Sequence, residues 1–276
     1  MSARVRPATP EDLPAIVELM EASLGDGMPR KPEFYLWKHH HNPFGSSLVL
    51  LAEDDEGLVG LRAMMRWRFR LGDQLIDAVR PVDTATHPRF QRRGLFTRLT
   101  HEVLGVLAEN GVRLVFNTPN DKSRPGYLKM GWQTVGVMPL WVRPGGRFAV
   151  RGGRAREGGV KLVTPRDDRL QTDRVAGYLD WRYRQAPDLT YRVLGDGDVG
   201  VIVRDRDRGG RNELTVVDVA APTRASVPLA ASVLRRAVRG SSSDYALAMA
   251  APGTREAAVL ALAGFVPAGR RGPHLV

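Results

Sequence analysis

The sequence of 276 residues contains no cysteine. This absence excludes disulfide bonds, thiolate nucleophiles and zinc sites built on cysteine. It agrees with a reducing compartment, so we expect a cytoplasmic protein. The sequence also lacks any run of about 18 uncharged apolar residues, so we expect no membrane span. Its first residues lack the apolar core of a signal peptide, and we expect them to be part of the folded protein.

Acidic residues are in the minority, with 30 Asp and Glu against 41 Lys and Arg, and the formal net charge is +11. Such an excess of basic residues favours anionic partners, whether nucleotide phosphates, nucleic acid or an anionic membrane surface. An arginine-rich composition with solvated charges is the alternative. No basic cluster is interleaved with aromatic residues, as a groove for single-stranded nucleic acid would require. Nucleic acid is therefore not the expected partner.

The first half of the chain predicts the strands and helices of a mixed sheet. Arg4–Arg6 is expected to be a short strand, and a helix follows to about Ala22, with Thr9 as its N-cap. Apolar runs separated by turn residues predict two hairpins, which join residues 48–52 to 58–65 and residues 67–71 to 74–86.

Pro81 interrupts the last of these strands. Because proline donates no hydrogen bond to a ladder, it predicts a bulge or a strand that parts from its neighbour. A helix is expected from Gly94 to Asn110, since apolar residues recur there at helical spacing. The segments that follow predict a short strand at 114–117, a short helix at 123–130, and a final strand region of this unit at Trp132–Val142.

The composition changes after Val142. Glycine and basic residues dominate residues 143–161, which predicts a basic linker or an exposed hairpin. We therefore expect a first domain at residues 1–145, a linker at 146–162 and a second domain at 163–276. Three segments of the first half recur in the same order in the second half, which indicates a duplication. These are 34–39 as 177–183, 82–85 as 217–220, and 126–132 as 260–265.

The segment from Thr86 to Thr97 has the features of an anion-binding loop. A strand is expected to end at Thr86 and a helix to begin near Gly94. Backbone amides at a helix start are unpaired and lie at the positive end of the helix dipole, which suits a diphosphate. Gly94 lets the backbone approach the anion closely, and Arg92 and Arg93 add positive charge. A simple strand-to-helix connection is the alternative for this loop taken alone.

This loop resembles the signature of the GNAT acyltransferase superfamily, in which a strand end and a proline are followed by Gln/Arg-x-x-Gly-x-Gly/Ala. Gln91 to Gly94 fit that signature, whereas Phe96 stands where the family has glycine or alanine. The segment Val5–Leu13 also resembles the family's first strand and helix. Further residues follow the family's spacing downstream, namely Asn120, Ser123, Tyr127 and Gly131-Trp132. Together these matches span roughly residues 3–142.

The resemblance implies a GNAT-like α/β fold with a mixed, largely antiparallel central sheet flanked by helices, and a second, smaller GNAT-like unit. It implies a V-shaped slot between strands that end at Thr86 and Asn117, with acetyl-CoA as the acyl donor. Pantetheine is expected to pair with the backbone of Thr84, Ala85 and Thr86. The diphosphate is expected on Gln91, Arg92, Arg93, Gly94, Leu95, Phe96 and Thr97. Asn120 and Ser123 are further candidate cofactor contacts, with capping of the short helix as the alternative for Asn120.

By the same resemblance, Tyr127 is the general acid that protonates the coenzyme sulfur, and packing near Trp132 is its alternative role. The general base is poorly marked. Asp83 is the candidate because it lies on the strand beside the slot, while a salt-bridge role for Asp83 and a water chain as the base are the alternatives. His39-His40-His41 does not predict a metal site, because neighbouring side chains diverge.

The implied function is an N-acetyltransferase acting on an amine of a small molecule or metabolite, and a homodimer is compatible with it. Two alternatives stay open, namely an aminoacyl-tRNA-dependent transferase with paired GNAT-like units and a non-catalytic acyl-CoA-binding sensor. In the second half, the loop 220–228 corresponds to the diphosphate loop but has no glycine and carries Pro222 and Pro228. Proline has no amide to offer an anion, so we expect the second unit to have lost cofactor binding and to shape the acceptor site or an oligomer contact. No motif identifies the acceptor.

Overall fold

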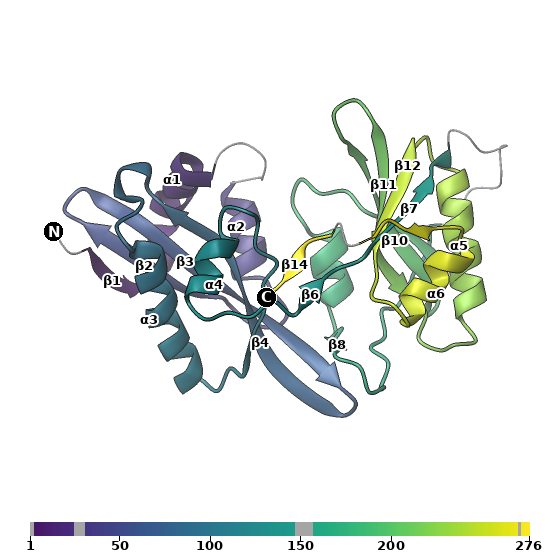
Figure 1. Ribbon diagram of the computed structural model, residues 1–276, viewed down its shortest axis with the longest axis horizontal. Helices are drawn as coiled ribbons and strands as arrows, with labels where there is room; N and C mark the ends of the chain where they lie inside the picture. Colours follow the sequence, from purple (N-terminus) through teal and green to yellow (C-terminus); the bar gives the residue numbers. More distant parts are fainter. Residues whose placement is uncertain (1–2, 25–30, 147–156, 270–271) are drawn as a thin grey trace. The chain divides into compact units, whose positions relative to one another are not determined.

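The computed structural model describes residues 3–24, 31–146, 157–269 and 272–276. The chain forms two compact units, each built on a sheet with helices packed against it (Figure 1). The first unit comprises residues 1–133 and 166–188, and the second comprises residues 134–165 and 189–276. Both sheets are mostly antiparallel with one parallel pair each, so the predicted class, a mixed α/β fold with largely antiparallel sheets, is confirmed.

The sheet of the first unit has six strands, of which the first five pair in chain order. They are β1 (Arg4–Pro7), β2 (Leu48–Asp54), β3 (Gly57–Leu71), β4 (Gln74–Thr86), β5 (Leu114–Val115) and β8 (Gln171–Thr172), which pairs with β3. The two predicted hairpins are β2–β3 and β3–β4. They share β3, a single strand of 15 residues where the sequence predicted two shorter ones.

Helices cover both faces of this sheet (Figure 1). They are η1 (Pro10–Asp12), α1 (Leu13–Leu24), α2 (Pro32–His39), η2 (Pro88–Phe90), α3 (Leu95–Glu109) and α4 (Arg124–Lys129). Leu51 packs with α1 on one face, whereas its neighbour Leu50 packs with α3 on the other, because successive strand residues point to opposite faces. Thr9 lies at the predicted cap, where the Asp12 carboxylate accepts hydrogen bonds from its amide and its hydroxyl.

Strand β4 carries a bulge and then leaves its neighbour β5. The pairing with β3 moves from Val82 to Ala85 across a single residue, Arg62, so that two residues of β4 oppose one of β3. Pro81 itself is still paired with β3, so the bulge that the sequence predicted begins two residues further along. Between β4 and β5 the described residues pair twice, the second time at Val79. The two strands therefore part, and a gap opens between the end of β4 and the chain after β5.

A pair of tryptophans ties the returning segment 166–188 to the first unit. Trp37 of α2 and Trp181 of the π-helix η4 (Asp180–Arg184) stack with ring centroids 5.3 Å apart. Each indole donates a hydrogen bond to the other residue's backbone carbonyl, over 2.6 and 2.9 Å. Two segments that the sequence paired as repeats thus pack against each other within one unit.

The second unit also has a six-stranded sheet, with the order β13-β7-β12-β11-β10-β9. Its strands are β7 (Leu140–Pro144), β9 (Arg192–Asp196), β10 (Val199–Asp207), β11 (Asn212–Ala220), β12 (Tyr245–Met249) and β13 (Val266–Pro267). Two further strands, β6 (Gly136–Val137) and β14 (His274–Leu275), form a separate pair. Its helices are α5 (Val227–Arg239) and α6 (Arg255–Leu262).

The division of the chain differs from the linear boundary expected between residues 145 and 146. The region Trp132–Val142, expected to end the first unit, instead supplies β6 and β7, and β7 pairs with β12 and β13 of the second unit. Of the expected basic linker, residues 147–156 lie outside the described residues, and Glu157 and Val160 form bridges to the second unit's own chain. Composition identified the glycine-rich segment, but strand pairing assigns the residues on both sides of it to the second unit.

Candidate active site

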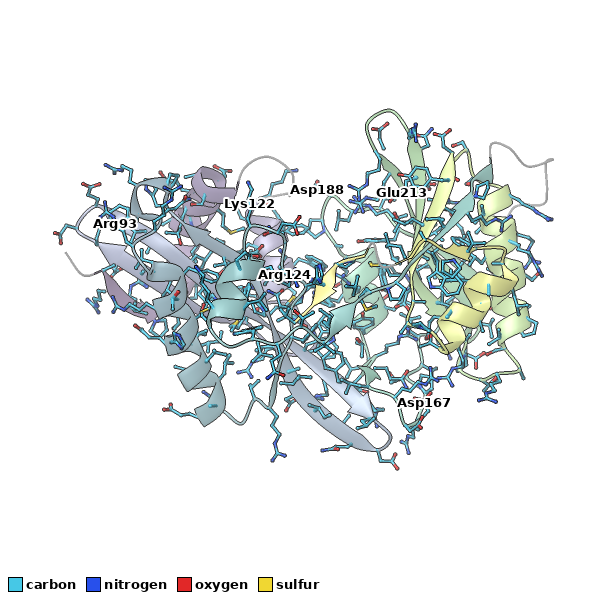
Figure 2. All side chains as sticks on the ribbon, viewed as in Figure 1. Arg93, Lys122, Arg124, Asp167, Asp188 and Glu213 are labelled. Atoms are coloured by element: carbon cyan, nitrogen blue, oxygen red, sulfur yellow. The ribbon has the colours of Figure 1, made fainter. Side chains whose placement is uncertain are left out.

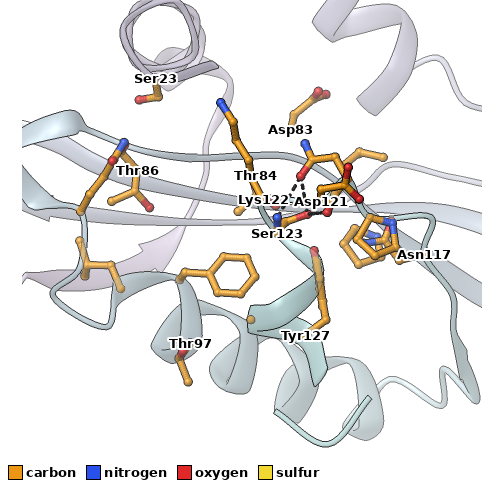
Figure 3. Close-up of a pocket in the computed structure, with 18 of the residues that line it drawn as sticks. Ser23, Asp83, Thr84, Thr86, Thr97, Asn117, Asp121, Lys122, Ser123 and Tyr127 are labelled. Carbon is orange, nitrogen blue, oxygen red and sulfur yellow. Dashed lines mark hydrogen bonds between the residues drawn. The ribbon is translucent and has the colours of Figure 1, made fainter. Parts of the chain in front are cut away.

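A cavity of about 1160 Å³ lies in the first unit, where β4 and β5 part (Figure 3). Its walls come from the end of β4, the β4–α3 loop, the loop after β5 and α4. The sequence-predicted residues that line it are Asp83, Thr84, Thr86, Gln91, Arg92, Gly94, Leu95, Phe96, Thr97, Asn120, Ser123 and Tyr127. Two predicted residues do not line it. Ala85 is buried against α1, and Arg93 lies outside the cavity with its guanidinium 4.9 Å from the centre of the Phe90 ring.

A row of unpaired backbone amides borders one end of this cavity. The amides of residues 92–97 form no hydrogen bond with any described residue, and the amide of Gln91 makes one bond of 3.4 Å to Pro88. Gly94 turns the chain into α3 with a φ of 81°, a conformation in which glycine is unstrained. Because these amides lie at the start of a 15-residue helix, the helix dipole adds positive potential there. The loop therefore offers consecutive donors to an anion.

Basic side chains surround the loop and the opposite wall of the cavity. Arg93 projects from the loop before α3, while Lys122 and Arg124 come from the loop before α4 and from its first turn (Figure 2). Arg92 has a φ of 63°, which a non-glycine residue seldom adopts. A strained loop residue beside a row of free amides is typical of a ligand-binding turn.

The wall opposite β4 contains Tyr127 of α4, whose hydroxyl receives a hydrogen bond from a buried arginine. Arg62 of β3 is 0% exposed and Tyr127 is 3% exposed. Nη1 of Arg62 donates to the Tyr127 hydroxyl oxygen over 2.9 Å and to the Thr84 hydroxyl oxygen over 2.7 Å. Since the tyrosine oxygen accepts this bond, its own proton is free to be donated to another group. Tyr127 is therefore a candidate proton donor.

The aromatic ring of Phe96 has a packing role at the position where this chain departs from the family signature. The Arg62 guanidinium lies 5.2 Å from the Phe96 ring centre and 5.3 Å from the Tyr127 ring centre, and the two ring centres are 5.4 Å apart, so the three groups contact one another. A side chain at Gly126 would approach Phe96 to 3.0 Å, so the glycine in α4 makes room for the ring. Phe96 thus lines the cavity and packs against Arg62 and Tyr127.

Comparison with known families agrees with this geometry. Residues 4–135 match the model of a family described as an acetyltransferase (GNAT) domain. That segment contains the amide loop, the parted strands and Tyr127. Residues 4–135 form a GNAT acetyltransferase domain. A comparison with curated proteins finds no match.

Solved structures resemble the whole chain in fold. A probable N-acyltransferase of unknown function from Enterococcus faecalis has a TM-score of 0.70 at 15% identity, covering 100% of this chain and 72% of that chain. A GCN5-related N-acetyltransferase from Anabaena variabilis has a TM-score of 0.70 at 14% identity, covering 99% and 72%. Eis1 from Mycobacterium abscessus has a TM-score of 0.61 at 14% identity, with the same coverage. At these identities the likeness establishes the fold, and it includes the second unit.

Within the GNAT domain, the candidate base Asp83 is held in an ion-pair network. Its carboxylate accepts hydrogen bonds from Nζ of Lys38 over 2.7 Å and from Nε2 of His39 over 2.8 Å. Burial raises the pKa of Asp83, but the hydrogen bond from His39 and the charge of Lys38 outweigh it and hold the pKa well below its usual range. Asp83 has a φ of 46°, imposed by the bulge. Its carboxylate is therefore ionised and only weakly basic.

His39 completes this network as a neutral ring. Burial lowers its pKa, and the hydrogen bond that the ring donates to Asp83 only partly offsets that effect. A neutral ring whose Nε2 donates to Asp83 must accept at Nδ1, where the Ser47 hydroxyl lies 2.9 Å away. His40 and His41 are exposed while His39 is buried, so the three histidines diverge. No cluster of three metal-binding side chains occurs among the described residues.

Two further predicted residues serve the turn before α4 in the GNAT domain. The side-chain oxygen of Asn120 accepts hydrogen bonds from the amide of Ser123 over 2.9 Å and from its hydroxyl over 3.0 Å (Figure 3). This contact corresponds to the capping alternative for Asn120. Tyr127 also packs on Trp132 with ring centres 4.7 Å apart, so its packing role coexists with an oriented hydroxyl.

Sequence reasoning missed two arginines of this site, the buried Arg62 and the partly buried Arg80. Arg62 is the one basic residue in the apolar run from Gly57 to Met65. Nothing in the sequence identifies the side chain that it contacts. Arg80 precedes Pro81 on β4 and lines the cavity.

Among the described residues, no helix is long and apolar enough to cross a membrane.

Proposed function

We propose that the GNAT domain transfers an acetyl group from acetyl-CoA to the amine of a small molecule. The observation that carries the proposal is the row of free amides at residues 92–97, which opens onto the gap between β4 and β5. A diphosphate is a strong acceptor for consecutive amides at a helix start, and coenzyme A contains one. The gap is then the path along which the pantetheine arm reaches Tyr127.

The proposed donor site uses the residues that line the cavity from Thr86 to Thr97. The diphosphate binds the amides of the loop, and Arg92 adds charge at its edge. Beyond Val79 the inner edge of β4 has no strand partner among the described residues, which leaves room for the pantetheine amides to pair with its backbone at Thr84–Thr86. The Thr86 carbonyl accepts a bond of 3.3 Å from Nε2 of Gln91, which pantetheine would displace. In Figure 3, Thr86 lies at one end of the cavity and Asn117 at the other, with Tyr127 between them.

In the proposed reaction, the neutral amine of the acceptor attacks the thioester carbonyl and the coenzyme A thiolate leaves. Tyr127 donates its proton to the sulfur, which makes the thiolate a better leaving group. Arg62 is a positioning residue in this step, because its bond to the tyrosine oxygen directs the hydroxyl proton away and stabilises the negative charge left behind. Proton transfer of this kind contributes about 10²- to 10⁴-fold in rate.

We propose that water accepts the amine proton and that Asp83 acts through its charge. A carboxylate bonded to both Lys38 and His39 is a poor proton acceptor near neutral pH. Asp83 instead holds the side chains of Lys38 and His39 in place. This assignment follows the salt-bridge alternative for the residue and leaves the reaction without a side-chain base.

A thiol-release assay with acetyl-CoA tests the proposal, run against a panel of amines, aminoglycosides and amino sugars. We expect coenzyme A to be released in proportion to the amine supplied. Titration calorimetry with acetyl-CoA and with tRNA separates this function from a tRNA-dependent transferase, which would bind tRNA and not the thioester. Tight acetyl-CoA binding without release for any acceptor would identify a sensor and overturn the proposal.

A further inference from the structure

We propose that the acceptor of the GNAT domain carries an anionic group, a carboxylate or a phosphate, and that Arg80 binds it. This inference rests on the proposed function, because it names the class of acceptor used by the same cavity. The observation behind it is a partly buried guanidinium that lines the cavity and has a hydroxyl, not a carboxylate, as its partner.

Arg80 has far fewer partners than its burial requires. Nη2 donates to the Thr118 hydroxyl over 2.6 Å, and Nε is buried without any partner. No carboxylate of the described residues forms an ion pair with it. Burying an unpaired charge is costly, so buried arginines are normally paired with carboxylates or phosphates. An anionic ligand in the cavity would supply an ion-pair partner to the accessible part of the guanidinium.

The charges around Arg80 strengthen this need. Burial lowers the pKa of Arg80, and the positive charge of Arg182 lowers it further, while Asp83 raises it. Asp83 does not neutralise Arg80, because its oxygens already accept from Lys38 and His39. The Asp83 carboxylate is therefore already paired, and the Arg80 guanidinium still lacks an anionic partner.

The position of Arg80 assigns it to the acceptor and not to coenzyme A. It lies six residues before Thr86 on β4, on the order of 20 Å away along an extended strand. Thr86 adjoins the amide loop. Tyr127 shares the Arg62 Nη1 donor with Thr84 of β4, and therefore lies between the Thr86 end and the Arg80 end of the cavity. A donor that extends from the loop to Tyr127 leaves the Arg80 end of the cavity for the second substrate.

The same charges disfavour a polycationic acceptor. Arg80, Arg92 and Lys122 line the cavity, against the carboxylates of Asp83 and Asp121. Because Lys38 and His39 already pair with Asp83, the potential that remains at the Arg80 end is positive. Acceptors with several ammonium groups would meet like charge there, at a penalty in affinity.

Calorimetric titration of matched amine pairs into the coenzyme A-saturated protein tests the inference. The pairs are β-alanine against β-alaninamide and phosphoethanolamine against ethanolamine, with spermidine as the polycation. The first pair isolates a carboxylate and the second a phosphate. We expect one anionic member to bind about 10- to 100-fold more tightly than its neutral counterpart, as is usual for a charge-assisted hydrogen bond. Equal binding of both members in both pairs, or tighter binding of spermidine, overturns the inference.

Variants locate the effect. Arg80→Gln should abolish the anionic preference, and Arg80→Lys should keep part of it. Arg68→Gln is the matched control, because Arg68 lies on β3 in an exposed pair with Asp77 and outside the cavity. An anionic preference that survives Arg80→Gln in a folded protein would assign it elsewhere and refute the role of Arg80.

Turnover with the same pairs separates this inference from the proposed function. Anion-selective binding that Arg80→Gln removes, with no coenzyme A release from acetyl-CoA, would uphold the anion site and reject acetyl transfer. Release with neutral and anionic amines at equal KM would uphold transfer and reject the anion site.

Discussion

The two units contain the same succession of elements around one parallel strand pair, but the length of that pairing differs between them. In the first unit an antiparallel hairpin leads through α3 to β5, and in the second a hairpin leads through α5 to β12. Strands β4 and β5 pair at two positions, whereas β11 and β12 pair at four. The cavity of the first unit lies where its strands part. A shared topology therefore does not by itself create a ligand slot. The slot lies in the unit whose parallel strands pair over the shorter length.

The helix that follows each hairpin shows the same contrast. The amides of residues 92–97 before and within α3 are unpaired. At α5, the amides of Ser226 and Val227 bond to Thr223 and Arg224, and Pro228 has no amide. Two amides of the second helix start are therefore bonded and a third is missing, so fewer consecutive donors remain for an anion. That the second unit has lost cofactor binding stays a prediction.

A third difference lies at the bulge of each hairpin. In the first unit Arg62 faces the bulge, and in the second Ile202 adjoins it, and both are 0% exposed. An isoleucine needs no partner there, whereas the arginine needs Thr84 and Tyr127. A buried charge is seldom worth its desolvation in stability alone. Its presence in the unit with the cavity indicates that it serves the site.

Replacing Tyr127 with phenylalanine is expected to have the largest effect on the comparison, because it removes the proton donor that the second unit lacks. We expect kcat to fall by about 10²- to 10⁴-fold while the Kd for acetyl-CoA stays unchanged. Steady-state thiol release and calorimetry measure the two quantities. An unchanged kcat would show that the hydroxyl donates no proton in the reaction.

Asp83→Asn should mainly cost stability. Breaking a buried ion pair from one side costs about 3–5 kcal/mol, because Lys38 loses its partner. The folded-state pKa of Asp83 lies below its unfolded value, so its stabilisation is complete above about pH 4 and is lost as the pH falls below that value. Chemical denaturation from pH 7 to pH 3 should therefore show the wild type and the variant converging.

The same variant tests the role assigned to Asp83 in catalysis. If water accepts the amine proton, the dependence of kcat/KM on pH between about 6 and 9 keeps its shape in Asp83→Asn. Loss of an inflection in that range would make Asp83 the base after all. Glu109→Gln, a change at an exposed residue outside the cavity, controls for the loss of one negative charge.

Arg62→Leu makes the bulge of the first unit resemble that of the second. We expect kcat to fall by about 10- to 100-fold, since a charged hydrogen bond to the Tyr127 oxygen is lost. Stability should change little, because an apolar side chain replaces a buried unpaired charge. Thermal unfolding and thiol release are measured together, with Arg62→Lys as the conservative variant that should recover part of the activity. A fall in stability without a fall in kcat would make Arg62 purely structural.

Gly94→Ala should have the smallest effect of the four. A side chain at φ 81° strains the loop by roughly 1 kcal/mol, which should weaken acetyl-CoA binding several-fold. Gly105→Ala in the middle of α3, where a side chain meets open space, is the control and should leave the Kd unchanged. Pro228→Ala completes the comparison, and it should confer no affinity on the second unit because the amides of Ser226 and Val227 remain bonded.

Local features of the first unit were predictable from residue patterns. The cap at Thr9, the hairpin turns at Gly57 and Gly72, and the helix start at Gly94 all depend on residues within a few positions of one another. The row of free amides followed from the same local logic, because any helix start leaves its first amides unpaired.

Features that depend on distant residues were not predictable. Nothing near Arg62 in the sequence indicates Tyr127, which is 65 residues away and meets it through the packing of α4 on the sheet. The location of the bulge at Asp83 and not at Pro81 follows from pairing with β3. Likewise, the assignment of β7 to the second unit depends on β12 and β13, which lie more than a hundred residues along the chain.

The sequence by itself determined the class of fold, the amide loop and the type of residue at the site, because spacing along a chain controls caps, turns and strand periodicity. The tertiary structure decided which strands pair, where the two units divide and which side chains surround Tyr127 and Arg80. Those outcomes depend on burial, and a residue becomes buried only when segments far apart in the chain close over it.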